Sequence, residues 1–149
     1  MSVGEWAAFT AAFISGANII VTAVLTRNRD RTSWSRAALS DTLVAFLEAS
    51  WRSSDAARDR HELGPRPPDP AAAAHLEDIV ESAFGELRTS LTRLRLFASE
   101  SVGAAGVDLL IKHRELRDAQ LADRPALLET VAAARRKLIK AARRDLKTD

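Results

Sequence analysis

Trp6–Thr26 reads WAAFTAAFISGANIIVTAVLT, a stretch of 21 residues without one charged side chain. Glu5 precedes it, and a cluster of arginines begins at Arg27. An α-helix rises about 1.5 Å per residue, so this stretch would reach about 31 Å as a helix. That length suffices for the hydrocarbon core of a bilayer, which is about 30 Å thick. The stretch therefore predicts one membrane-spanning helix that carries the rest of the chain.

Two other interpretations of this stretch stay open. A cleaved signal peptide has a basic start and a small-residue cleavage site, whereas this start carries Glu5 and its apolar run is longer. A helix buried in the subunit interface of a soluble oligomer is the stronger alternative, because the stretch is only moderately hydrophobic. Its polar members are Thr10, Ser15, Asn18, Thr22 and Thr26.

The charges that flank the predicted span set its orientation. Arg27, Arg29 and Arg31 follow it, and no basic side chain precedes it. Lys and Arg stay on the cytoplasmic side of a membrane, and Trp favours the interface, where we expect Trp6. Residues 1–31 are thus predicted to form an inner-membrane anchor with a basic exit. The N-terminus would lie outside, and residues 32–149 would form a cytoplasmic domain.

Small residues recur along one side of the predicted span. Ala8, Ala12 and Gly16 are spaced by four residues, and Asn18 lies on the neighbouring stripe. Such small stripes let helices approach closely in lipid, and an Asn side chain bonds across to a partner helix. The pattern favours self-association, with a homo-oligomer or another protein as the partner, although alanine-rich sequences also produce this spacing without any contact.

The composition after the span favours helices. The chain of 149 residues is rich in Ala and Leu, which favour helices. It has only six Gly, five Pro and 5% aromatic residues, so residues that break helices or favour strands are few. That length fits one modest core. The chain has no Cys, which excludes disulfides and thiolate metal sites.

Hydrophobic periodicity and breakers divide this domain into helices. Apolar residues at three- and four-residue steps predict a first helix over 33–61, starting at Thr32–Ser33 or at Ser40–Asp41. A Pro-rich loop at 64–70 ends it. A long helix follows over about 70–98, with Asp69 as its cap and Pro70 in its first position.

The remaining residues predict two more helices. Ser99–Ser101 marks a boundary, after which Gly103 and Gly106 weaken the start of a shorter helix to about 119. Asp123 caps a last helix with Pro125 in its first turn. The expected fold is all-α: an N-terminal transmembrane helix and a four-helix antiparallel bundle-like domain, in which three helices are long and a short third one bridges a corner.

Charge is distributed unevenly along the chain, whose net charge is +2. Residues 41–87 are predominantly acidic and residues 88–149 predominantly basic. Arg136, Lys140, Arg143 and Lys147 follow one another at i, i+4, i+7 and i+11, so they share one face of the last helix. This basic face has three possible uses: pairing with the acidic middle of the chain, contact with anionic lipid, or contact with nucleic acid. Nucleic acid is the least favoured, because the helix has no aromatic, Asn or Gln side chain.

Catalytic and metal-binding signatures are not found in the sequence. No second His follows His61, His75 or His113 at three or four residues, as a bundle metal site would need. The Gly103–Gly106 segment lacks the Lys and Ser/Thr of a phosphate-binding loop. We therefore expect no enzyme activity, no cofactor, no metal and no small-molecule substrate.

The order of these features resembles a loose group of uncharacterised actinobacterial single-pass helical proteins. The segments that carry the resemblance are Arg27–Arg36, Ala45-Phe46-Leu47, Leu94–Val102 and Ala132–Leu146. The resemblance implies an anchor, an Arg-rich exit and a cytoplasmic helical bundle, and it implies no catalytic residue. The expected function is a membrane-anchored interaction or scaffold module. The alternative is a soluble all-α oligomer that binds nucleic acid through its basic last helix.

Overall fold

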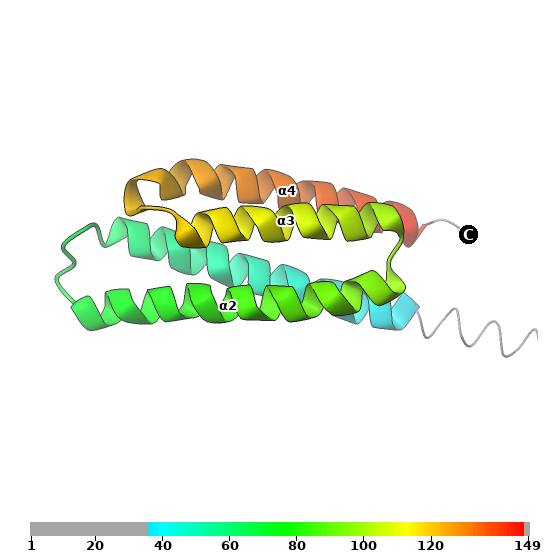
Figure 1. The fold of residues 1–149 in the computed structure, drawn as a ribbon, viewed down its shortest axis with the longest axis horizontal. Helices are drawn as coiled ribbons and strands as arrows, with labels where there is room; N and C mark the ends of the chain where they lie inside the picture. Colours follow the sequence, from blue (N-terminus) through cyan, green and yellow to red (C-terminus); the bar gives the residue numbers. More distant parts are fainter. Residues whose placement is uncertain (1–35, 148–149) are drawn as a thin grey trace, which may run out of the picture. The chain divides into compact units, whose positions relative to one another are not determined.

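The computed structural model describes residues 36–147, and Figure 1 shows them as a set of antiparallel helices. Residues 36–62 are helical, and they are followed by α2 (Pro70–Phe97), α3 (Glu100–Asp118), the 3-10 turn η1 (Leu121–Asp123) and α4 (Arg124–Asp145). No strand occurs over 36–147. The chain divides into two units, Met1–Ala37 and Ala38–Asp149, and the helical bundle belongs to the second. The predicted all-α bundle is confirmed.

The predicted anchor lies outside the described residues. So do the residues assigned to its interfaces, its basic exit and its association face, namely Trp6, Ala8, Ala12, Gly16, Asn18, Arg27, Arg29 and Arg31. Between residues 36 and 147, no helix combines the length and the apolar character that a membrane span requires.

The loop between the first helix and α2 has the predicted turn chemistry. Gly64 adopts a positive φ of 73°, a conformation that residues with a Cβ rarely adopt. The Asp69 carboxylate accepts hydrogen bonds from the Ala71 and Ala72 amides at 2.9 and 3.2 Å, so it caps α2 as expected. The Ser40–Asp41 start is wrong, because the chain is already helical at residue 36. The Thr32–Ser33 start lies outside the described residues.

Helix α3 is the shortest of the described α-helices and ends at Asp118, close to the predicted bound, but it does not merely bridge a corner. It spans 19 residues against 22 for α4, and it packs along both α2 and α4. Ser99 caps it, with its hydroxyl accepting from the Val102 amide at 3.4 Å. Gly106 supports the packing, since a Cβ built there would lie 2.8 Å from Leu91 Cδ1 and 3.3 Å from Leu94 Cδ2. The glycine that weakens the helix locally thus lets α3 approach α2 closely.

All four helices contribute to one core. Phe46 from the first helix, Leu87 from α2, Leu109 from α3 and Leu138 from α4 are each 0% exposed. Burying one such side chain contributes about 2 kcal/mol relative to leaving it in water. The cluster extends from Leu39 to Ala142, so its described members all belong to the unit that begins at Ala38.

Candidate contact surface

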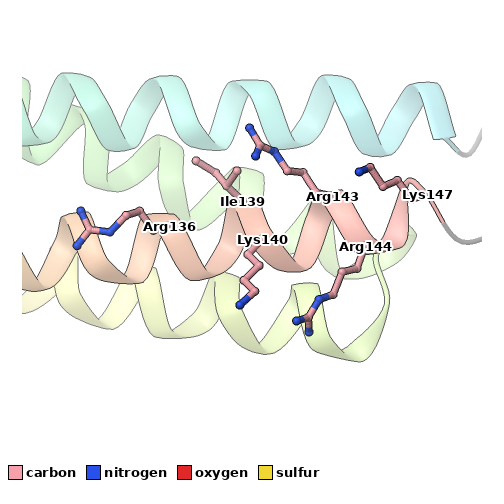
Figure 2. A pocket seen from close by; sticks show the side chains of 6 residues that line it. All are labelled: Arg136, Ile139, Lys140, Arg143, Arg144 and Lys147. Carbon is pink, nitrogen blue, oxygen red and sulfur yellow. The ribbon is translucent and has the colours of Figure 1, made fainter.

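The predicted basic face lies exposed on α4. Arg136, Lys140, Arg143 and Lys147 are all exposed, whereas Leu138 and Ala142 on the opposite side of the helix are buried. Together with Ile139 and Arg144 these four line an open hollow of about 550 Å³ (Figure 2). Figure 2 shows Arg143 and Lys147 on one side of the α4 axis and Lys140 and Arg144 on the other. The four predicted residues therefore belong to one continuous surface.

Over residues 36–147, none of these four basic side chains forms an ion pair. Of the acids on α4, Asp145 accepts a hydrogen bond at 3.0 Å from the Ser99 amide. Next to this face, Lys137 of α4 lies 3.9 Å from Asp108, and both side chains are exposed. Such an exposed pair contributes less than about 1 kcal/mol.

Four carboxylates in the acidic middle of the chain pair with other arginines. Glu77 lies 2.9 Å from Arg124 and 3.3 Å from Arg60. Glu81 lies 3.7 Å from Arg117. Asp55 pairs with Arg58 at 3.0 Å, and Glu86 pairs with Arg52. These arginines come from the first helix, α3 and the start of α4. Pairing with the acidic middle is therefore not how the four basic residues of α4 are used in the described part of the chain.

A second basic hollow lies between α2 and α3. It measures about 320 Å³, and its residues are Phe84, Arg88, Leu110, Ile111, Arg114 and Arg117. The Arg117 guanidinium lies 4.3 Å from the centroid of the Phe84 ring and contacts Asp118 at 2.8 Å, so part of this charge is already engaged. The hollow on α4 is larger and has more basic side chains around it.

A buried polar cluster joins three helices. The Ser50 hydroxyl and His113 Nε2 are 2.8 Å apart, and Arg135 Nε donates to the same hydroxyl at 3.0 Å. Arg135 also donates to the Ser50 carbonyl at 3.1 Å and to the Ser54 hydroxyl at 2.6 Å. Its guanidinium lies 5.2 Å from the centroid of the half-exposed Trp51 ring. The cluster thus cross-links the first helix, α3 and α4 at a point inside the bundle.

The chemistry of this cluster is that of a structural contact. A Ser–His pair resembles an activated nucleophile, but Ser50 and His113 are 0% and 1% exposed. Burial first, and the Arg135 charge second, lower the pKa of His113 from 6.5 to about 3. A base with that pKa accepts protons poorly near neutral pH. His113 Nδ1 is also buried without a hydrogen-bond partner, so in a protonated ring, where both nitrogens carry hydrogens, this donor would have no acceptor.

A second buried cluster lies near the Pro-rich loop. Arg124 is only 5% exposed, and its Nη2 donates to Glu77 at 2.9 Å, while its Nε and Nη1 have no partner among the described atoms. Arg60 donates to the Gly64 carbonyl at 2.8 Å, and its Nε lies within ion-pair distance of Glu77 but is not aligned for a hydrogen bond. One carboxylate thus neutralises two largely buried guanidinium groups.

Two of the histidines contact other elements of the bundle, His61 at η1 and His113 at the first helix. His61 Nδ1 and the Leu121 carbonyl oxygen are 2.7 Å apart, so this ring ties the first helix to η1. His113 shares its helix face with Leu109 and Leu116, which are four residues before and three residues after it and are both 0% exposed. That periodicity is the signal that places His113 in the core. In the part of the chain from 36 to 147, no group of three or more His, Asp or Glu side chains is placed to hold a metal ion.

The comparisons with known proteins add no relative. No protein-family description, no curated protein and no solved structure matches this chain.

Proposed function

We propose that this chain is a membrane-anchored helical interaction module without catalytic activity, and that the basic face of α4 is its contact surface. One observation supports this most strongly. Arg136, Lys140, Arg143 and Lys147 are exposed on one surface and have no ion pair within residues 36–147. A surface with such an excess of positive charge attracts an anionic partner.

The sequence supports the anchored form of the module. Trp6–Thr26 has the length and composition of a span, and Arg27, Arg29 and Arg31 follow it. We also propose that the chain belongs with the actinobacterial single-pass helical proteins that it resembles, in which an anchor, an Arg-rich exit and a helical domain follow one another in this order. The soluble all-α oligomer that binds nucleic acid is the alternative function, and the same basic face would serve it.

Retention on immobilised heparin, a polyanion without lipid, tests the contact surface. The test variant carries Arg136→Gln, Lys140→Gln, Arg143→Gln and Lys147→Gln, and the matched control carries Arg58→Gln, Arg66→Gln, Arg88→Gln and Arg114→Gln. Both variants lose four positive charges. At about 1 kcal/mol per basic residue beside an anionic surface, the test variant should bind up to about a thousandfold more weakly.

The full-length chain in mild detergent is used for all three proteins, so the Arg27–Arg36 cluster is the same in each. We expect the test variant to elute at clearly lower salt than the wild type, and the control to stay close to the wild type. The control also removes Arg88 and Arg114 from the hollow between α2 and α3. Equal losses in both variants would show that retention follows net charge alone, and the assignment to α4 would be wrong.

A further inference from the structure

We infer that one end of the bundle docks on an anionic lipid bilayer. This docking end consists of Arg93, Arg95 and Leu96 in the last turns of α2 and of Arg143, Leu146 and Lys147 at the end of α4. The inference rests on the proposed function, and it names the partner of the basic face and the way in which the bundle meets that partner.

A hydrogen bond links the segment between α2 and α3 to the end of α4. The Ser99 amide, just after α2, donates to the Asp145 carboxylate at the end of α4 at 3.0 Å. Figure 1 shows the first described residues of the first helix at this same end, with the Pro-rich loop at the other. The last turns of α2 and α4 and the start of the first helix therefore lie at the same end of the bundle.

The docking end combines exposed apolar and basic side chains. Leu96 is 74% exposed, the highest value among the large apolar side chains of the described residues, and Leu146 is 41% exposed. Arg93, Arg95 and Lys147 are exposed as well. Apolar side chains beside basic ones are typical of surfaces that insert shallowly into anionic membranes. Water around Leu96 is released when that side chain enters the interface.

Charge in the end turns is predominantly positive. Arg93, Arg95, Arg143 and Lys147 form no ion pair over residues 36–147. The acids in these turns are Glu100, which is exposed, and Asp145, which already accepts from the Ser99 amide. The one aromatic side chain in these turns is Phe97, which is partly buried against the core, and the turns hold no Tyr, Trp, Asn or Gln side chain to stack on or read a base. This favours a lipid surface over nucleic acid.

The short link between the predicted span and the bundle supports a lipid bilayer as the partner. The predicted span ends at Thr26, and the bundle unit begins at Ala38. A link of this length reaches about 40 Å at most, even when it is fully extended. If the predicted span crosses the bilayer, such a link keeps the bundle within reach of the lipid and raises the effective concentration of lipid that its basic residues meet.

A fluorescent label tests the docking directly, and the absence of Cys from the chain makes single labelling clean. Full-length protein with Leu146→Cys, or with Glu62→Cys at the opposite end as the control, carries an environment-sensitive dye. Both are reconstituted into vesicles of phosphatidylcholine alone or of phosphatidylcholine with phosphatidylglycerol. We expect the label at 146 to shift to the blue in anionic vesicles only, and the label at 62 to stay unchanged.

The charge dependence is tested in the same system. Arg93→Gln, Arg95→Gln, Arg143→Gln and Lys147→Gln, added to Leu146→Cys, should lower the ratio of docked to undocked protein by about a thousandfold. The set Arg58→Gln, Arg66→Gln, Arg88→Gln and Arg114→Gln should leave the shift in place. Added salt should reverse the shift in the wild-type background.

Several outcomes would overturn the docking. An identical spectrum at 146 in neutral and anionic vesicles at low salt contradicts it, as does an equal response at 62. A shift at 146 with a DNA oligonucleotide but not with anionic vesicles would assign the end to nucleic acid instead. Heparin retention distinguishes the two claims, because it needs no lipid: if retention depends on α4 and the label at 146 is silent, the docking fails while the contact surface stands.

Discussion

Glu77→Gln is expected to lower the free energy of unfolding by about 2–3 kcal/mol. The Glu77 carboxylate lies 2.9 Å from Arg124 and 3.3 Å from Arg60, whose side chains are 5% and 13% exposed. Removing the negative charge leaves two buried guanidinium groups without a counter-charge. Glu77 itself is 41% exposed, so solvent reduces the loss below that of a fully buried pair.

Two further variants distinguish the loss of a counter-charge for two buried guanidinium groups from the general loss of one surface charge. Glu81→Gln is the matched control on the same helix, because Glu81 is 68% exposed and 3.7 Å from Arg117, and it should cost less than about 0.5 kcal/mol. Arg124→Met should cost less than Glu77→Gln, since Glu77 keeps Arg60 and Met fills the space. Urea unfolding of residues 36–149 measures all three, and equal small losses for Glu77→Gln and Glu81→Gln would contradict the cluster.

His113 is expected to make the bundle lose stability in acid by about 2–3 kcal/mol between neutral pH and about pH 4.5. Burial, reinforced by Arg135, lowers the pKa of His113 in the folded protein from 6.5 to about 3. Below pH 6.5 the unfolded chain therefore binds a proton that the folded chain does not. The loss is absent above pH 6.5, grows by up to about 1.4 kcal/mol per pH unit as the pH falls, and levels off near the folded pKa.

His113→Gln isolates this contribution. Gln keeps a side-chain donor and acceptor near Ser50 but does not titrate. The carboxylates of the chain titrate in both proteins, so their effects cancel in the difference between the wild type and the variant. We expect that difference in unfolding free energy, from urea curves, to move in favour of the variant as the pH falls. A difference that stays constant from pH 7 to about 4.5 would show that His113 is protonated normally in the folded state.

Local features of the sequence predicted the Pro-rich loop and the start of α2, whereas the predicted Asp123 cap forms no side-chain hydrogen bond. Gly64, Asp69 and Pro70 act within a few residues of themselves, so their turn and cap chemistry is readable without a fold. Helix α3 ends close to the predicted bound, but its packing along α2 was not predicted, because the contact of Gly106 with Leu91 and Leu94 is tertiary.

The buried clusters could not be predicted in this way. Ser50 is 63 residues from His113 and 85 from Arg135, and Glu77 is 47 from Arg124. Neighbours in sequence gave His113 a basic environment, whereas its helix face carries apolar residues. Pairing between residues far apart in the sequence also determines which charged side chains have an ion-pair partner. Glu77, Glu81 and Glu86 of α2 pair with arginines from other helices, and none of these pairs includes a residue of the basic face of α4.

Extraction of membranes with alkaline carbonate tests the anchoring of the module most directly. Alkaline carbonate releases proteins that are bound by charge and retains those that cross the bilayer, so it separates the predicted span from the basic surfaces. We predict that full-length protein stays in the membrane pellet, and that a chain with Ile19→Asp and Val21→Arg in the middle of the span is released. Recovery of the unaltered full-length protein in the supernatant would contradict the account.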